Sequence, residues 1–257
     1  MTFSVADTLD QHILRTERPR PPDGLWHPSS LFSCMRQAIY EVRGVPASDP
    51  RTDKSRRILK MGSTVHEIVQ EALTADSGAE AVYNEVEVNI PPLRVTGHCD
   101  TLLRHADDDY ELLEFKSISP RGMQYGDLPK SEHVRQARTY VYGLRRFGGT
   151  VVLTGEDLSP LTANTLTIPP LGSKLREPRL AYFSRDDLRV EEFVLDPDPE
   201  WDQRFEDYIA RLEKYREDGT ALPLRLPLEK GRRNWLCKDY CQFRSRCWDN
   251  DPEGEVL

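Results

Sequence analysis

The chain has 257 residues and a formal net charge of −8, with 38% hydrophobic and 30% charged residues. A chain of this length can bury one sizeable core with appended segments, and the composition is typical of a soluble globular protein. The absence of a Gly-rich phosphate-binding loop excludes a helicase motor. No signal peptide or transmembrane run is present, which predicts a cytoplasmic protein without a membrane partner.

Hydrophobic spacing and turn residues predict the elements in chain order. The first half should contain a long helix over 56–73, strands over 95–103 and 110–118, and a helix over 131–147. The second half should contain strands over 150–154, 163–168, 180–184 and 189–195, and an amphipathic helix over 199–217. We therefore expect an α/β fold, a central mixed sheet flanked by helices.

Three parts are predicted along the chain. They are an N-terminal helical part over 1–80, a core over 81–220, and a C-terminal cysteine-containing segment over 221–257 that ends in an acidic, disordered tail.

The strands over 95–103 and 110–118 form a predicted β-hairpin that carries Asp100, Glu114 and Lys116. If the loop is odd and centred on Asp107, Asp100 lies opposite Glu114, with Cβ atoms roughly 5 Å apart. Lys116 lies two residues further along and shares the face of Glu114. A loop one residue longer or shorter would put the two carboxylates on opposite faces, so the prediction depends on the register.

Two carboxylates this close repel each other unless a cation lies between them. A hard cation with oxygen ligands, Mg²⁺ or Mn²⁺, suits this position. It can polarise a phosphate and lower the pKa of a bound water, while Lys116 offsets charge at the phosphorus. The alternative is a surface hairpin with a cross-strand ion pair.

The flanking helices carry further candidates. His66 lies at the edge of the apolar stripe of the helix over 56–73, where it is either a packed residue or a further metal ligand. Gln136 and Tyr140 are four residues apart on the helix over 131–147 and share a face. They either contact a phosphate or base near the site or form an ordinary, partly exposed pair.

The order His66, Asp100, Glu114-x-Lys116, Gln136-x-x-x-Tyr140 resembles the RecB-like branch of the PD-(D/E)XK nuclease superfamily, over about residues 29–145. The resemblance implies that His66, Asp100, Glu114 and the carbonyl of Phe115 bind the metal, and that Lys116 is the catalytic lysine. It also implies a restriction-endonuclease-like core and assigns Gln136 and Tyr140 to the family's Gln-Tyr motif.

Five cysteines occur, and three of them crowd near the C-terminus as Cys237-x3-Cys241-x5-Cys247. Disulfides are unlikely in a cytosolic chain, so this cluster favours a metal centre. Four thiolates, with Cys34 as the fourth, suit either Zn²⁺ or an iron–sulfur cluster. Cys99, next to Asp100, is interpreted as a small buried residue.

One distant N-terminal cysteine with a C-terminal triplet resembles the 4Fe–4S centre of the iron-containing RecB-like nucleases, among them the CRISPR-associated four family of exonucleases. The resemblance implies a 4Fe–4S cluster on Cys34, Cys237, Cys241 and Cys247, with structural Zn²⁺ as the alternative. The segment over 28–36 also resembles the family's Ser-rich helix start before the first cysteine, which implies a short helix with Ser29 or Ser30 as N-cap. This chain departs from the family pattern because three residues, rather than two, separate Cys237 from Cys241.

Basic residues gather in two segments in spite of the negative net charge. Residues 225–247 hold seven Lys or Arg against two acidic residues, and residues 51–60 hold five against one. Aromatic rings interleave with the first segment, as in proteins that bind single-stranded nucleic acid. The alternative, favoured for Trp235 and Phe243, is that the charges are solvated and the rings surround the metal centre.

The resemblance as a whole implies a Mg²⁺- or Mn²⁺-dependent DNA exonuclease, prokaryotic or virus-encoded. It would act on single-stranded DNA or DNA ends in recombination, repair or CRISPR adaptation. The alternative is a non-catalytic iron–sulfur DNA-binding or adaptor subunit of a recombination or CRISPR-adaptation complex. The presence of Asp100, Glu114 and Lys116 favours the enzyme, because an adaptor has no need of all three.

Overall fold

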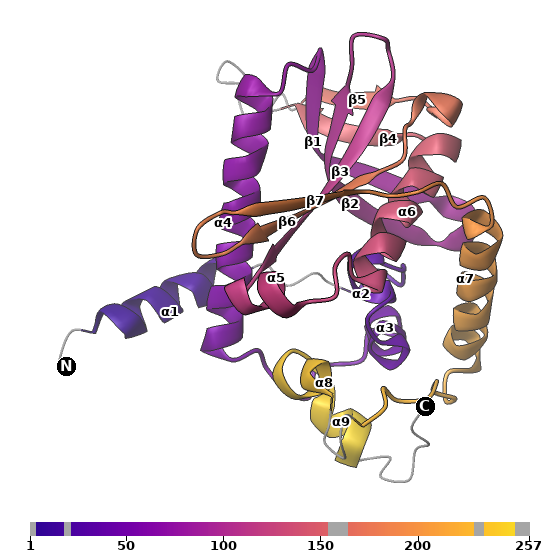
Figure 1. Cartoon of the computed structure of the whole chain (residues 1–257). Helices are drawn as coiled ribbons and strands as arrows, with labels where there is room; N and C mark the ends of the chain where they lie inside the picture. Colours follow the sequence, from indigo (N-terminus) through magenta and orange to yellow (C-terminus); the bar gives the residue numbers. More distant parts are fainter. Residues whose placement is uncertain (1–3, 18–21, 154–163, 229–233, 250–257) are drawn as a thin grey trace. The chain divides into compact units, whose positions relative to one another are not determined.

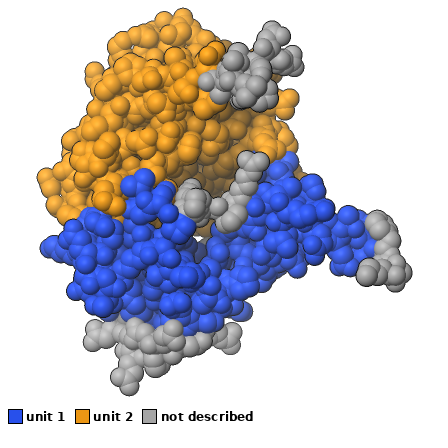
Figure 2. Space-filling view, turned by 180° about the vertical axis from the view of Figure 1, so that it is seen from behind, with its two compact units in different colours: residues 1–25, 34–64, 211–257 blue, residues 26–33, 65–210 orange. Residues whose placement is uncertain are grey.

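The computed structural model describes residues 4–17, 22–153, 164–228 and 234–249. The chain divides into two compact units, coloured in Figure 2. Unit 1 consists of Met1–Leu25, Cys34–Thr64 and Arg211–Leu257, and unit 2 of Trp26–Ser33 and Val65–Ala210. Within the described residues, no helix has the length and apolar character needed to cross a membrane.

Unit 2 is built on a seven-stranded sheet in the order β5-β4-β1-β2-β3-β6-β7 (Figure 1). The strands are β1 (Ala81–Ile90), β2 (Val95–Arg104), β3 (Tyr110–Ile118), β4 (Gly149–Leu153), β5 (Asn164–Ile168), β6 (Arg179–Ser184) and β7 (Val190–Val194). Strands β3 and β6 pair in parallel, and the other neighbours are antiparallel. The predicted mixed sheet is confirmed.

Helices flank this sheet. They are α2 (Pro28–Leu31), the later part of α4 (Asp53–Asp76), α5 (Pro120–Tyr125), α6 (Ser131–Arg146) and the early part of α7 (Trp201–Asp218). A parallel β3–β6 pair needs a long crossover, and α6 lies within it. This topology carries α6 back across β1, β3 and β6.

The two faces of β3 have different chemical character. Phe115 packs with Val65 and Phe183 in an apolar cluster that Val69 and Leu73 of α4 complete. Glu114, one residue earlier, instead bonds to Gln136 of α6. Because side chains alternate along a strand, α4 and α6 cover opposite faces of β3.

The short N-terminal helix begins earlier than predicted. Its N-cap is His27 rather than Ser29 or Ser30, and Pro28 occupies the first helical position. Proline suits that position because its missing N–H would have no helical partner and its φ is already helical. The His27 ring is held by a 3.0 Å contact between Nδ1 and the carbonyl of Thr96.

Unit 1 is helical in its described part, with α1 (Val5–Thr16), α3 (Met35–Val42), the first part of α4, α8 (Trp235–Asp239), α9 (Arg244–Asp249) and the last part of α7. Tyr40, Phe243 and Cys247 form its buried cluster. The predicted tail after Asp249 lies outside the described residues, as do Lys230, Arg232 and Arg233 of the basic segment.

Asp49 joins the N- and C-terminal parts of unit 1. Its carboxylate accepts bonds from the Ser245 amide at 2.7 Å, the Ser245 hydroxyl at 2.8 Å and Arg244 at 2.9 Å. Although burial opposes it, these bonds hold the pKa of Asp49 below its ordinary value. The segment around Ser245 is therefore fixed by a carboxylate nearly two hundred residues away in sequence.

The basic segment 51–60 is largely paired within unit 1. Arg51 and Arg56 bond to Glu17 at 2.7 and 2.9 Å, and Arg57 bonds to Asp10 at 2.6 Å. These arginines therefore have acidic partners in the protein itself, which favours a structural role for this part of the segment.

Candidate active site

The predicted register of the hairpin is confirmed, and the strands separate at the predicted site. The β2–β3 ladder runs from Arg104↔Tyr110 to Thr101↔Leu113, so Asp100 and Glu114 would form the next pair. Instead, Oδ2 of Asp100 accepts a 2.6 Å bond from the amide of Phe115. The Asp100 side chain thus takes the place of a β2 backbone group as the hydrogen-bond partner of β3, at the point where the two strands separate.

Glu114 is the buried centre of the site, with 1% of its surface exposed. Its Oε1 accepts from Lys116 Nζ at 2.7 Å and from Gln136 Nε2 at 2.7 Å. Its Oε2 is buried and has no hydrogen-bond partner among the described residues. Burial, with the nearby charge of Asp100, raises the pKa of Glu114 to about 7. Although burial opposes it, the charges of Glu114 and Asp100 raise the pKa of Lys116.

Helix α4 brings His66 to Asp100. The ring Nδ1 lies 3.3 Å from Oδ1 of Asp100, and the ring edge packs on Phe115 at 5.8 Å between centroids. Burial lowers the pKa of His66, but the hydrogen bond to Asp100 and the charges of Asp100 and Glu114 together outweigh burial, so the net pKa is raised. The sequence-predicted set His66, Asp100 and Glu114 is therefore gathered in unit 2.

Gln70 is a site residue that the sequence analysis missed. Its Nε2 donates to the main-chain carbonyl of Asp100 at 2.9 Å and to Oε1 of Glu85 at 3.0 Å. Gln70 lies four residues after His66, so both side chains leave the same face of α4. The four-residue spacing from His66 is the sequence feature that could have identified Gln70 as a site residue.

Glu85 explains why the carbonyl of Asp100 needs a side-chain partner. The β1–β2 ladder includes Asn84↔Thr101 and Val86↔Cys99 but omits the intervening pair, Glu85 and Asp100. Glu85 has φ of 53°, a left-handed conformation that is uncommon for a residue with a side chain. Because buried carbonyls require a hydrogen bond, Gln70 takes the place of the missing strand partner.

Helix α6 presents Gln136 and Tyr140 to the same region, and both are buried rather than partly exposed. A Cβ at Gly97 would lie 2.9 Å from the Tyr140 hydroxyl oxygen, so only glycine leaves room for this ring. Burial, with the charge of Glu114, raises the pKa of Tyr140 well above its ordinary value.

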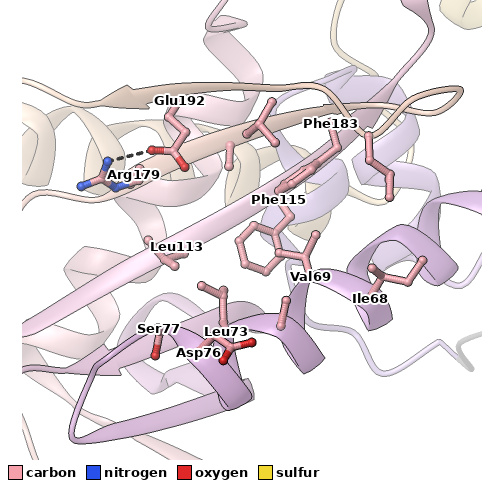
Figure 3. A pocket seen from close by; sticks show the side chains of 14 residues that line it. Ile68, Val69, Leu73, Asp76, Ser77, Leu113, Phe115, Arg179, Phe183 and Glu192 are labelled. Atoms are coloured by element: carbon pink, nitrogen blue, oxygen red, sulfur yellow. Dashed lines mark hydrogen bonds and ion pairs between the residues drawn. The ribbon is translucent and has the colours of Figure 1, made fainter.

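The opposite face of β3 borders a cavity whose lining is mainly apolar. The cavity has a volume of about 350 Å³. It is lined by apolar side chains that include Val69, Phe115 and Phe183 (Figure 3). Arg179 on its wall is neutralised by Glu192 at 2.9 Å. The ionisable groups suited to binding a metal or a phosphate lie instead around Glu114.

The four cysteines of the predicted cluster all belong to unit 1. Cys34 is the N-cap of α3, Cys237 lies in α8 and Cys247 in α9. Burial, with the neighbouring thiols, raises the pKa of Cys34 to about 11 and that of Cys241 to about 12. All are free thiols. Cys34 interacts electrostatically with Cys237 and Cys247, and Cys241 interacts with the other three.

Two donors point at these sulfurs. The amide of Phe243 donates to Sγ of Cys241 at 3.4 Å, and Arg36 donates to Sγ of Cys247 at 3.8 Å. Cys99 is fully buried in unit 2 and is not part of the group, as predicted.

As the side chains stand, no three His, Cys, Asp or Glu residues in the described ranges converge closely enough to hold a metal ion. In the cysteine group the thiols lie near one another without converging on one point. Around Asp100 the carboxylates are occupied by Phe115, Lys116 and Gln136, and the free acceptor is Oε2 of Glu114.

Comparison with known proteins identifies the family of the chain. The family model of the PD-(D/E)XK nuclease superfamily matches residues 12–248. The crystal structure of SSO0001 is similar with a TM-score of 0.50 and 17% sequence identity, over 93% of this chain and 91% of that chain, which concerns the fold alone. No curated protein matches the chain. Because the family match spans almost the whole sequence, the chain belongs to the PD-(D/E)XK nuclease superfamily.

Proposed function

We propose that the chain is a Mg²⁺- or Mn²⁺-dependent DNA exonuclease of the RecB-like branch. Its substrate is single-stranded DNA or DNA with free ends, in recombination, repair or CRISPR adaptation. Nucleases of the superfamily act on DNA and use divalent metal ions such as Mg²⁺ or Mn²⁺, which supports the reaction class.

The observation that carries this proposal is the unpartnered oxygen of Glu114. An unpaired buried carboxylate oxygen is costly, and a divalent cation satisfies it better than any neutral donor. Asp100, whose charge already acts on Glu114, supplies the second carboxylate. This donor set of carboxylate oxygens with one imidazole fits Mg²⁺ or Mn²⁺.

The residues that would hold the ion are His66, Asp100, Glu114 and the carbonyl of Phe115. The bound ion would supply charge neutralisation and polarisation of the phosphate. Lys116, fixed by its bond to Glu114, is then a cation held beside the reacting phosphate and stabilises charge that develops on it. Gln136 orients Glu114, and Tyr140 closes the site on the side of Gly97.

A 4Fe–4S cluster on Cys34, Cys237, Cys241 and Cys247 is the second part of the proposal, with structural Zn²⁺ as the alternative. The mutual electrostatic effect of the thiols and the N–H···S contacts from Phe243 and Arg36 support it. Raised thiol pKa values mean that a metal centre must displace protons from these sulfurs, so loading should be favoured by higher pH.

The test is cleavage of end-labelled single- and double-stranded DNA by purified protein with Mg²⁺, Mn²⁺ or EDTA. Metal-dependent release of nucleotides or short products from DNA ends is expected, and circular single strands should resist. Asp100→Ala, Glu114→Ala and Lys116→Ala should each lower the rate by about 10²–10³. His66→Ala should lose activity that higher Mn²⁺ partly restores.

Protein that binds DNA without cutting it under any of these conditions would instead be the adaptor. Variants of Asp100, Glu114 and Lys116 that all cut at the wild-type rate would show that the site is wrong. Anaerobically purified protein should contain iron and acid-labile sulfide, whereas stoichiometric zinc without iron would replace the cluster and leave the nuclease proposal intact.

A further inference from the structure

We propose that a small polar pocket beside Lys116 binds a phosphate group of the DNA strand. The proposal rests on the proposed nuclease function and names a substrate contact that the metal-binding residues do not provide. The pocket has a volume of about 120 Å³. Its polar lining consists of Ser29, Ser33, Lys116, Glu132, His133 and Gln136.

The pocket opens directly from the candidate centre. Lys116 and Gln136 line it and also donate to Oε1 of Glu114. A group bound there lies next to the phosphate on which the carboxylates act. The volume corresponds to roughly four water molecules at ~30 Å³ each, enough for a group of about five heavy atoms such as phosphate.

His133 lines the pocket and can supply a hydrogen-bond donor to it. The amide of Lys130 donates to the Tyr182 hydroxyl at 3.0 Å, and the hydroxyl oxygen lies 2.9 Å from Nδ1 of His133. The proposal uses the arrangement in which the hydroxyl hydrogen is donated to Nδ1. That bond places the ring proton on Nε2, which has no other partner among the described residues. Burial, with the charges of Lys116 and Lys130, lowers the pKa of His133 to about 3, so the ring is neutral.

The serines supply two more donors. The hydroxyls of Ser29 and Ser33 line the pocket and make no hydrogen bond to any described residue. Ser30, between them, instead donates to the carbonyl of His27 at 3.4 Å and does not line the pocket. Two hydroxyls, a neutral imidazole N–H, an amide and one ammonium group form a donor-rich lining, and phosphate oxygens are acceptors only.

Glu132 is the lining group that opposes an anion. Its carboxylate adds a negative charge to the lining, whereas the one ammonium group, Lys116, already shares its charge with Glu114 at 2.7 Å. If the pocket binds phosphate, the serine donors and the Glu132 carboxylate should have opposite effects on the affinity for DNA. Removal of the serine donors weakens binding, and removal of the Glu132 charge strengthens it.

The experiment compares S29A/S33A and Glu132→Gln with Ser30→Ala as the matched control. Steady-state cleavage is measured with Mn²⁺ on oligonucleotides that carry a 5′-phosphate, a 3′-phosphate or hydroxyls at both ends. The double variant should raise KM about tenfold with a small effect on kcat, Glu132→Gln should lower KM, and Ser30→Ala should match wild type. The same proteins are titrated with these oligonucleotides in EDTA, by fluorescence anisotropy.

Each outcome decides the proposal. A KM effect confined to one phosphorylated end identifies a terminal phosphate, and an equal effect on all substrates identifies an internal phosphodiester. Pocket variants that match Ser30→Ala while wild type cuts DNA overturn the pocket and leave the nuclease standing. If wild type cuts nothing, the nuclease proposal fails, and the anisotropy titrations alone decide the pocket.

Discussion

Gln136 donates a 2.7 Å hydrogen bond to Oε1 of Glu114, the same oxygen that accepts from Lys116. Two donors on one oxygen leave the other, Oε2, free for a cation. The helix after the hairpin therefore decides which oxygen of the buried carboxylate faces the candidate metal position.

Gln136→Leu should lower the DNA cleavage rate about tenfold with little loss of stability. The change removes one donor to a charged acceptor, a bond worth about 1.5–3 kcal/mol, and lets Glu114 rotate. Single-turnover cleavage measures the effect. Gln203→Leu, at an exposed glutamine that bonds to Asp207 on α7, is the matched control and should cut at the wild-type rate. Equal rates for the two variants would refute the orienting role of Gln136.

The stability of the metal-free protein should fall as the pH rises through about 7. Glu114 has a pKa raised to about 7 from 4.5, so its protonated form stabilises the fold below 4.5 and this contribution is lost as the pH passes 7. A divalent ion takes the place of the proton, so Mn²⁺ should raise the melting temperature more at about pH 8 than at about pH 5.5. Glu114→Gln should remove this difference, and its persistence in the variant would assign it to another group.

Gln70→Ala should raise the Mn²⁺ concentration needed for half-maximal cleavage by about 10–100-fold, the usual effect of losing a residue that supports a ligand. The variant leaves the Asp100 carbonyl without the bond that replaces its strand partner. Activity at saturating Mn²⁺ should recover, because the ligands themselves remain. Glu71→Ala, at the adjacent exposed position, is the control. A Gln70 variant with unchanged metal dependence would reduce this residue to a packing role.

Cys34→Ser should give protein with little metal and poor solubility, whereas Cys99→Ser should keep the metal and lose only packing. Metal–thiolate bonds contribute to the folding free energy when they close a long loop. Cys99 is buried in unit 2, whereas the other four cysteines belong to unit 1. Iron, zinc and sulfide analysis of both variants after anaerobic purification is the measurement. Equal metal content in the two would remove Cys34 from the ligand set.

Asp49→Asn should lower the stability of unit 1 by about 1–3 kcal/mol, because donors from Ser245 and Arg244 lose a charged acceptor. The pKa of Asp49 is below its ordinary value of 3.8, so its contribution is complete above pH 3.8 and is lost as the pH falls below it. Denaturation curves of wild type and variant should therefore converge in acid. A constant gap down to low pH would point to lost packing instead.

Local sequence patterns predicted many of the elements, but not the strand β1 or the helices α1 and α5. The pairing of β2 with β3 has the register expected for a loop centred on Asp107, although the sequence alone did not determine that loop. The strand from Tyr110 to Ile118 has the predicted bounds. Helical spacing predicted α6 and the shared face of Gln136 and Tyr140. Even the buried state of Cys99 followed from its place in the strand.

Features that depend on contacts between distant segments could not be predicted from the sequence. The separation of β2 from β3 at Asp100, and the left-handed Glu85 that calls for Gln70, arise where three elements meet. The hydrophobic periodicity of the sequence does not indicate a strand separation or a left-handed residue. The N-cap was misplaced because serine is the stronger capping residue, whereas Pro28 determined where the helix begins.

The discontinuous make-up of unit 1 has a consequence for biosynthesis. Translation delivers all of Trp26–Ser33 and Val65–Ala210 before any residue of Arg211–Leu257 emerges. Domains generally fold as units during synthesis, with earlier segments first. The sheet with Glu114 can thus form on the ribosome, while Cys34 must wait for Cys237. Any metal centre on the cysteines is then inserted late, into a protein whose nuclease sheet has already formed.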